Sequence, residues 1–145
     1  MITQLKANQT DRVMDIWLRT SKKAHSFICP EYWENRYEEV KNRYLPASRT
    51  FVYTEGSDVC GFVSVLDGSF IGALFVDESF QNHGIGSLLI RYCQDHWPEL
   101  TLSAYVENER AVAFYRKHGF RVLSTSLAED GFHEEYTMKW AAGKI

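Results

Sequence analysis

The chain has few cysteines, and their placement argues against a metal site. It contains three, Cys29, Cys60 and Cys93, which are widely separated and odd in number. No two of them have the spacing of a C-x-x-C motif, and no histidine is grouped with them. We therefore expect no structural metal, and three reduced, mostly buried thiols in a cytoplasmic protein.

Long hydrophobic runs are also missing. The first residues, MITQLKANQTDR, lack the apolar core of a signal peptide, and no stretch approaches the ~20 apolar residues that span a bilayer. A net charge of −3 gives no electrostatic reason for nucleic-acid binding. We expect a cytoplasmic protein with neither a membrane nor a nucleic acid as partner. The mild acidity suits an acceptor that is itself cationic.

The composition that remains is that of an ordinary globular protein. The 145 residues are 45% hydrophobic and 24% charged, which fits a single domain over residues 1–145 with a sizeable core. The aromatic share is 14%, and many of these residues fall in the N-terminal third.

The spacing of apolar residues predicts an alternation of strands and helices. Helices are expected over residues 8–23, 30–46, 85–97 and 108–119, with start and stop signals at Asn8, Pro30, Pro46, Asn108 and Gly119. Strands are expected over residues 2–7, 50–55, 59–66, 70–76, 100–106, 120–127 and 132–140. The order β-α-α-β-β-β-α-β-α-β-β indicates an α/β fold with a mixed sheet flanked by helices.

The most informative stretch joins the strand at 70–76 to the following helix. Its glycines place several backbone N–H groups at a helix N-terminus, where they can hold an anion. Glycine is needed because a side chain would keep a phosphate away from the backbone. The loop is neither a Walker loop nor a dinucleotide-binding turn, and a simple turn is the alternative. Its residues are Gln81, Asn82, His83, Gly84, Ile85, Gly86 and Ser87.

A second stretch, Asn108 to Phe120, strengthens this interpretation. Asn108 and Tyr115 are seven residues apart, so two helical turns bring them to one face. A tyrosine there can hand a proton to a departing thiolate, because the pKa values of phenol and thiol lie within about two units of each other. The alternative is that Tyr115 is a core aromatic beside Phe114.

Together the two stretches resemble the GNAT superfamily of acetyl-CoA-dependent N-acetyltransferases. The Gln81-x-x-Gly84-x-Gly86 loop resembles its pyrophosphate motif, and residues 108–120 resemble its second cofactor motif. The element order matches that fold, whose sheet is mostly antiparallel, over essentially the whole chain. Within the superfamily the chain is similar to small bacterial YiaC- and YjaB-type members, through residues 108–120, Trp17, His25, Ser26, Phe27, Ile28, Tyr32, Trp33 and Phe70.

The resemblance implies acetyl-CoA as co-substrate, and it assigns roles to the residues that match. The backbones of Phe75 and Val76 would bind the pantetheine arm in a splay between strands 70–76 and 100–106. Residues 81–87 would hold the pyrophosphate, Asn108 would bind the cofactor arm, and Tyr115 would protonate the leaving sulfur. Asn82 stands where many members carry Arg-Gly or Lys-Gly. Backbone binding is expected to survive this departure, with a weaker cofactor affinity.

The sequence offers several candidates for the general base. An amine with a pKa near 10.4 is neutral in only about one molecule in a few thousand at pH 7, so its proton must be removed. Many relatives place a Glu on the strand before the glycine loop, but residues 69–76 contain no acid. His25 is the first candidate, and a structural histidine is the simpler interpretation of it. The alternatives are Asp67, Tyr105, Glu107 or a chain of waters.

Aromatic residues from elements that cover the thioester end are predicted to form a slot for a lysine stem or a peptide N-terminus. They are Trp17, Phe27, Trp33, Tyr44 and Phe70, and core packing is the alternative for each. Phe70 is favoured because its strand parity with Gly72 and Leu74 directs it towards the cleft. Acidic residues of the last hairpin attract a cationic acceptor or form a solvated surface: Glu129, Asp130, Glu134 and Glu135.

These features predict direct acetyl transfer to a primary amine, without a covalent enzyme intermediate. The protein itself is expected to be a monomer or a homodimer. We expect a protein lysine as acceptor, with a protein N-terminus or a small amine as alternatives. Two other functions fit the same scaffold. One is an acyl-CoA-binding sensor without useful catalysis, favoured by the missing strand Glu. The other is a toxin that acetylates aminoacyl-tRNA, which the acidic net charge of −3 disfavours.

Overall fold

The computed structural model describes residues 1–143, so the last two residues of the predicted domain lie outside it. A seven-stranded sheet in the order β1-β2-β3-β4-β5-β7-β6 forms its centre. All neighbouring strands are antiparallel except β4 and β5. The predicted mixed, mostly antiparallel sheet is therefore confirmed. The strands are β1 (Ile2–Gln4), β2 (Arg49–Glu55), β3 (Asp58–Leu66), β4 (Phe70–Val76), β5 (Glu99–Tyr105), β6 (Arg121–Leu127) and β7 (Glu134–Ala141).

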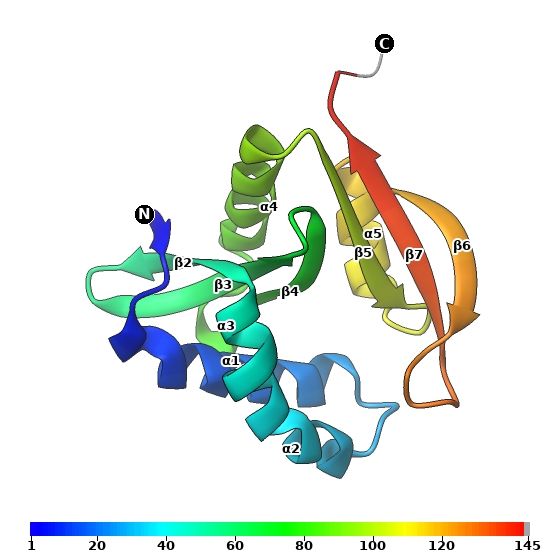
Figure 1. Ribbon diagram of the computed structural model, residues 1–145, viewed down its shortest axis with the longest axis horizontal. Helices are drawn as coiled ribbons and strands as arrows, with labels where there is room; N and C mark the ends of the chain where they lie inside the picture. The colour runs from blue at the N-terminus through cyan, green and yellow to red at the C-terminus, as the bar shows by residue number, and fades with distance from the viewer. Residues whose placement is uncertain (144–145) are drawn as a thin grey trace.

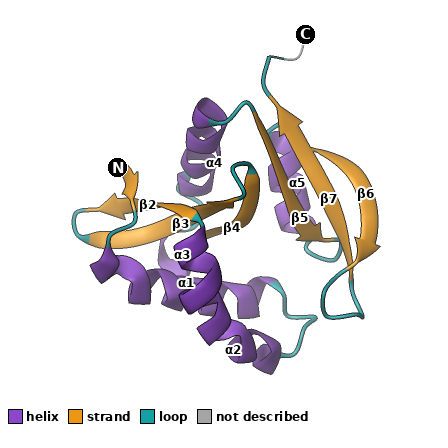
Figure 2. Cartoon of the chain, in the orientation of Figure 1, coloured by secondary structure: helices purple, strands orange, loops and turns teal. Residues whose placement is uncertain are grey.

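Helices cover both faces of the sheet (Figures 1 and 2). On one face α1 (Thr10–Ala24), α2 (Pro30–Glu39) and α3 (Leu45–Ala47) pack on Val52, Val59 and Phe62. On the other face α4 (Ile85–His96) and α5 (Glu109–Lys117) pack on the second core, which includes Val63, Leu100 and Met138. The sheet thus separates two apolar cores, each closed by its own set of helices.

The β3–β4 hairpin forms as its sequence predicts. Asp67 and Gly68 adopt φ values of 49° and 82°, and the Ser69 N–H donates to the Leu66 carbonyl at 3.2 Å. Two consecutive left-handed residues are the signature of the two-residue turn that matches the twist of a hairpin.

Three predicted boundaries differ from the observed ones. Asn8 does not cap the first helix but lies within the short turn η1 (Ala7–Gln9), where the Gln9 side chain instead accepts from the Lys6 N–H at 2.8 Å. The helix α2 itself ends at Glu39, although the helical run continues through the next two elements to Ala47, one residue after Pro46. A π-helical turn, η2 (Val40–Tyr44), follows α2 and leads into α3. Pro46 lies in the first turn of α3, where the missing N–H of a proline needs no partner.

The third correction concerns the last hairpin, whose strand β7 begins at Glu134 and not at Phe132. Phe132 and His133 lie in the β6–β7 loop because their N–H groups donate to the side chain of Asp130, at 2.9 Å and 3.1 Å. A carboxylate that binds two following N–H groups holds the chain in a turn instead of a strand.

The junction of β4 and β5 is the weakest part of the sheet. Within residues 1–143 the two strands pair at only two positions, Phe70 with Thr101 and Ile71 with Leu102. A bulge in the β3–β4 pairing leaves Gly72 as an extra residue on β4, and a bulge bends its strand. Beyond it the strands separate, and Figure 1 shows β5, β7 and β6 turning away from β2, β3 and β4.

Candidate active site

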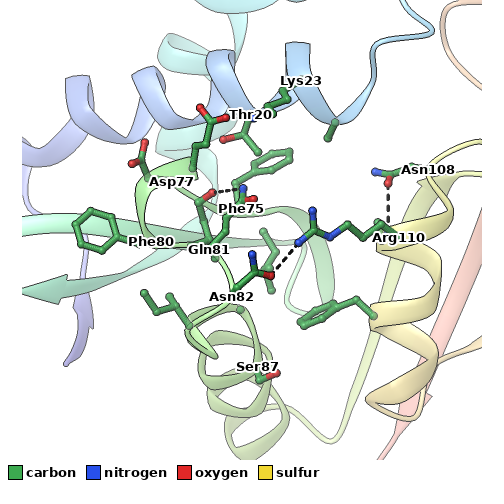
Figure 3. A pocket seen from close by; sticks show the side chains of 18 of the residues that line it. Thr20, Lys23, Phe75, Asp77, Phe80, Gln81, Asn82, Ser87, Asn108 and Arg110 are labelled. Atoms are coloured by element: carbon green, nitrogen blue, oxygen red, sulfur yellow. Dashed lines mark hydrogen bonds and ion pairs between the residues drawn. The ribbon is translucent and has the colours of Figure 1, made fainter.

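The separation of β4 and β5 opens into a cleft of about 740 Å³ (Figure 3). One wall comes from α1, the floor from β4, and the remaining sides from the loop before α4, the first turn of α4 and the length of α5. The predicted cofactor residues that line it are Phe75, Val76, Gln81, Asn82, Gly84, Ile85, Gly86, Ser87 and Asn108. Tyr115 lines it as well. His83 does not, and its ring Nδ1 lies 3.2 Å from the Phe80 carbonyl.

The loop before α4 leaves backbone donors free at the helix start. Gly84 adopts a left-handed φ of 81° directly before the helix, and the Leu88 N–H is the first to bond back, to the Gly84 carbonyl at 3.1 Å. The N–H groups of residues 85–87 therefore have no partner within the helix. They lie at the positive end of the helix dipole, which is where an anion is bound most favourably.

Asn82, which stands where many family members carry Arg-Gly or Lys-Gly, has a conformation and a contact that suit its position. Its φ is 68°, a conformation that glycine adopts freely and that asparagine tolerates better than most other side chains. The side chain is used as well, because Asn82 Oδ1 accepts from Arg110 Nη2 at 3.1 Å (Figure 3). The departure thus keeps the backbone shape and links the loop to α5.

Gly86 and Gln81 shape the inner surface of the loop. A Cβ added at Gly86 would lie 3.4 Å from the ring of Phe114, which is an ordinary van der Waals contact, so α4 and α5 approach each other closely at this glycine. Gln81 Nε2 donates to the Val76 carbonyl at 3.0 Å, which ties the loop to the end of β4.

The charges around the cleft are unevenly compensated. Asp77, which follows β4 and is 4% exposed, accepts from Arg19 Nη2 at 2.9 Å, and Glu78 pairs with Lys23. Arg110 and Lys117 also line the cleft, and neither forms an ion pair with a carboxylate of residues 1–143. The α5 side of the cleft therefore carries positive charge that is available to an anionic ligand.

Asn108 and Tyr115 meet at the cleft from one helix. Asn108 caps α5, since its Oδ1 accepts from the Ala111 N–H at 3.2 Å. Tyr115 lies two turns further on, and burial, with a smaller contribution from the nearby Cys93, raises the pKa of its phenol. A phenol is protonated at neutral pH at its ordinary pKa, and the raised pKa of Tyr115 makes it a weaker acid than a free phenol.

His25 is buried next to the cleft and does not line it. It is 8% exposed, and its ring packs on Tyr105, Trp33 and Phe27 with centroids 4.9 Å, 5.2 Å and 5.8 Å apart. Burial lowers the pKa of His25 to about 4, although the backbone of Ser21 opposes this shift. A neutral ring with so low a pKa is a weak proton acceptor. Its Nε2 lies 3.2 Å from Asn108 Nδ2, an amide donor, so His25 orients Asn108.

The predicted acceptor residues are only partly brought together. Phe27 and Trp33 join His25 and Tyr105 in one aromatic cluster on the α1–α2 face. Phe70 pairs with Thr101 where β4 and β5 are still joined, and it does not line the cleft.

The remaining acceptor and base candidates lie elsewhere. Tyr44 lies in the π-helical turn, with the Arg43 guanidinium 5.6 Å from its ring. Asp67 lies in the hairpin turn before β4, at the end of that strand opposite the glycine loop. Neither residue lines the cleft.

Sequence reasoning missed His133. Its Nδ1 lies 2.6 Å from Asp130 Oδ2, and its ring centroid is 5.3 Å from that of Phe27. The Asp-x-x-His spacing in a glycine-containing loop is the only signal of this pair in the sequence, and it indicates a turn as readily as a site.

No group of three or more His, Cys, Asp or Glu residues within residues 1–143 is arranged to hold a metal ion. None of the helices in the same range is long and apolar enough to cross a membrane.

Comparison with known proteins places this geometry in context. A family model of the acetyltransferase (GNAT) domain matches residues 46–122. The chain is 29% identical over 140 residues to the peptidyl-lysine N-acetyltransferase YiaC of Escherichia coli K12, covering 97% of this chain and 96% of the relative. It is 31% identical over 130 residues to the peptidyl-lysine N-acetyltransferase YjaB of the same strain, covering 89% and 87%.

Solved structures show the same arrangement of elements. The solution structure of apo YjaB from Escherichia coli has a TM-score of 0.84 at 28% identity and covers 99% of this chain and 98% of that one. The PaiA N-acetyltransferase of Thermoplasma acidophilum, crystallised with coenzyme A, has a TM-score of 0.79 at 16% identity and covers 97% and 98%. The latter likeness concerns the fold.

Proposed function

The chain belongs to the GNAT family of acetyltransferases, and on this premise we propose that it transfers acetyl from acetyl-CoA directly to the side-chain amine of a protein lysine. The observation that carries the proposal is the separation of β4 and β5 beside the free N-terminus of α4. That arrangement offers an extended strand edge and an anion site at one opening. The names of the relatives YiaC and YjaB support lysine as the acceptor.

The residues of the cleft fit the chemistry of coenzyme A. The unpaired edge of β4 at Phe75 and Val76 would bind the amides of the pantetheine arm. The N–H groups of residues 85–87, with Gly84 and Gly86 allowing close approach, would hold the pyrophosphate. Arg110 would add a charged donor to a phosphate. When bound, the molecule supplies a thioester as acyl donor.

The proposed step for Tyr115 is protonation of the leaving sulfur. Its phenol is protonated at neutral pH, as any tyrosine with an ordinary or raised pKa is, and burial raises its pKa, so a strongly basic thiolate is the group that it can protonate. Asn108 would hold the arm that carries the thioester, and its orientation is fixed by the helix cap at Ala111 and by His25. Each of these groups is set before a ligand arrives, which is the condition for efficient proton transfer.

The surroundings of the aromatic cluster support a cationic acceptor. Burial and the charges of Asp130 and Glu129 raise the pKa of Glu135, which shows a concentration of negative charge beside Tyr105, its partner across β5 and β7. A lysine ammonium would relieve this repulsion, and the rings of Phe27 and Tyr105 would pack against its aliphatic stem.

Thiol release from acetyl-CoA by the purified protein tests the proposal. The acceptor panel contains a lysine peptide with a blocked N-terminus, the same peptide with Lys→Ala and a free N-terminus, and small amines such as spermidine. We expect release with the first peptide, and mass spectrometry should place the acetyl group on its lysine. Release with the second peptide alone would replace lysine by an N-terminal amine. Calorimetric binding of acetyl-CoA without release in any sample would favour a sensor.

Three further expectations remain predictions. We propose that residues 1–145 act as one domain and that the protein is a monomer or homodimer in the cytoplasm. Light scattering of the purified protein measures the oligomeric state, and fractionation of cells measures the location.

A further inference from the structure

The β6–β7 loop holds a histidine in one fixed orientation. Asp130 Oδ1 accepts from the N–H groups of Phe132 and His133, which fixes the loop around the carboxylate. Its second oxygen, Oδ2, is then left for the His133 ring, whose Nδ1 lies 2.6 Å away. The Asp130 side chain is 8% exposed and that of His133 is 22% exposed, so the pair is largely shielded and His133 still reaches the surface.

This contact determines which ring nitrogen carries the proton. A carboxylate can only accept, so His133 Nδ1 donates to Asp130 and the lone pair of the neutral ring lies on Nε2. Burial would raise the pKa of Asp130, but hydrogen bonds from the N–H of Phe132 and from His133 outweigh it and lower the pKa. The carboxylate therefore stays charged and holds the His133 ring with its Nε2 lone pair free.

His133 Nε2 faces the carboxylate of Glu107 across a gap that can hold one nitrogen atom. Nε2 lies 3.9 Å from Glu107 Oε1, which is too far for a direct hydrogen bond. A nitrogen atom placed beside both can bond each at about 2.9 Å. Neither Glu107 nor His133 lines the cleft itself, but Glu107 directly precedes Asn108, which does. The rings of Phe27 and His25 also link His133 to Asn108, so the gap neighbours the proposed thioester site.

Aromatic rings complete the surroundings of this gap. The centroid of His133 is 5.3 Å from that of Phe27 and 6.4 Å from that of Tyr105. The same rings contact His25, which approaches Asn108 from the other side. An aliphatic stem that reaches the gap would therefore lie on apolar surface, with its charged end between a base and a carboxylate.

We propose that His133 Nε2 and Glu107 Oε1 bind the acceptor ammonium together, and that His133 is the general base that removes its proton. The proposal rests on the acetyl transfer proposed above and names the base that the chain needs in place of a strand glutamate. Glu107 recognises the charge, Asp130 positions the imidazole, and His133 accepts the proton. His25 has a separate role, which is to orient Asn108.

The proton balance of the step is as follows. One ammonium proton passes to His133 Nε2, and the nitrogen lone pair then forms the new C–N bond at the thioester carbon. The C–S bond breaks, and its electron pair stays on sulfur, which takes the proton of Tyr115. The second proton lost by the nitrogen returns to the Tyr115 oxygen, directly or through water. His133 releases its proton to solvent, so one proton leaves for each amide formed.

The test compares His133→Gln with His96→Gln, an exposed histidine on α4 that contacts Tyr92. We expect His133→Gln to bind acetyl-CoA as wild type does in calorimetry and to lose about 10²-fold in kcat/KM for the lysine peptide at pH 7.5. The loss should shrink towards pH 9.5, where more of the amine is neutral. A primary amine with a pKa below 6 is already neutral at pH 7.5, so wild type and His133→Gln should acetylate it at the same rate. His96→Gln should behave as wild type does in each assay.

Other groups near His133 must be considered in the pH profile. They are Asp130 on its own loop, Glu107 after β5, Tyr105 on β5, Glu135 on β7 and the Arg36–Glu129 pair that joins α2 to the loop. Burial raises the pKa of Tyr105, which removes it from the neutral range. Glu107→Gln provides a second variant, and it should raise KM for the lysine peptide more than it lowers kcat.

The outcomes separate the two proposals. Wild-type kcat/KM in His133→Gln at pH 7.5, or a loss that is equal at pH 9.5 and with the low-pKa amine, overturns the role of His133 and leaves acetyl transfer in place. Turnover by neither wild type nor variant, with any amine, overturns both. If His133→Gln is poorly folded by circular dichroism, Glu107→Gln decides, and an unchanged KM in that variant rejects the ammonium site.

Discussion

The guanidinium of Arg110 donates to Asn82 Oδ1 at 3.1 Å and so connects the first turn of α5 to the loop before α4 across the mouth of the cleft. The two residues are 28 positions apart in the sequence. Because Arg110 forms no ion pair within residues 1–143, this amide contact is what holds its charge at the opening.

This contact predicts a graded effect on cofactor binding. Arg110→Ala should weaken acetyl-CoA binding about tenfold, the value of one charge-assisted hydrogen bond. Asn82→Gly keeps the left-handed backbone and frees Arg110, so its effect should be smaller, about two- to threefold. Calorimetry with acetyl-CoA measures both. Arg116→Ala, on the same helix but outside the cleft, is the matched control, and an Arg110→Ala affinity equal to it would contradict the prediction.

Tyr115→Phe should separate binding from chemistry. Removal of the hydroxyl leaves the ring that packs on Phe114 and Phe120, at centroid distances of 5.3 Å and 5.6 Å, so the fold and the acetyl-CoA affinity should be retained. Loss of the proton donor should lower kcat on the order of 10²-fold. Steady-state kinetics and calorimetry on the same preparation check both statements. A kcat equal to that of wild type would remove Tyr115 from the mechanism.

His25 should make the stability of the protein pH-dependent. Its pKa is lowered to about 4 in the folded chain, against about 6.5 in an unfolded one. Between these values the unfolded chain binds a proton that the folded chain does not, so the free energy of unfolding rises with pH. The contribution is complete above pH 6.5 and is lost as the pH falls towards 4. Its size is about 3 kcal/mol.

Urea unfolding at pH 7 and pH 4.5 measures this effect. His25→Gln removes the titrating group, so the difference in stability between the two pH values should be smaller in the variant than in wild type. Burial also lowers the pKa of His118, but that residue is present in both proteins and cancels in the comparison. Parallel pH profiles for wild type and variant would show that His25 is not buried as a neutral group.

Local signals in the sequence predicted much of the fold. Asn108 as a cap and Asp67-Gly68 as a turn specify short-range geometry, and both form as predicted. Pro46 lies one residue before the end of the helical run, as expected, but the π-helical turn that divides this run is not visible in the residue pattern. Asn8 misled because the Gln9 side chain accepts from the Lys6 N–H, which closes a short turn over Asn8 before the helix begins.

The candidate site was harder to predict wherever it depends on long-range contacts. The glycine loop could be predicted because Gly84 and Gly86 indicate directly where the backbone turns and where it is open to a ligand. The pairs Asn82–Arg110 and Glu107–His133 join residues that are distant in sequence, and the value of each residue depends on its partner. The expected parity of Phe70 with Leu74 was wrong, because the bulge at Gly72 shifts the alternation of β4. Phe70 also lies where β4 and β5 are still joined, and the residue pattern does not say where two strands separate.

The three thiols should differ in reactivity. Cys60 and Cys93 are buried and Cys29 is exposed, so a thiol reagent should modify one cysteine in the folded protein and three in denaturant. Cys29 Sγ donates to Glu31 Oε1 at 2.7 Å, and this bond raises the pKa of the thiol. Its reaction at pH 7.5 should therefore be slower than that of a free thiol. Glu31→Gln should speed it several-fold, and an unchanged rate would show that the contact has no influence.

The short pairing of β4 with β5 affects how long the protein survives as well as what it binds. The two halves of the sheet share only the pairs at Phe70 and Ile71 along this boundary, and an occupant that bonds to both strand edges would complete the sheet there. Saturation at 100 times Kd adds about 2.7 kcal/mol to stability. The purified protein should therefore resist proteolysis better when acetyl-CoA is added, because a bound ligand opposes opening along this boundary.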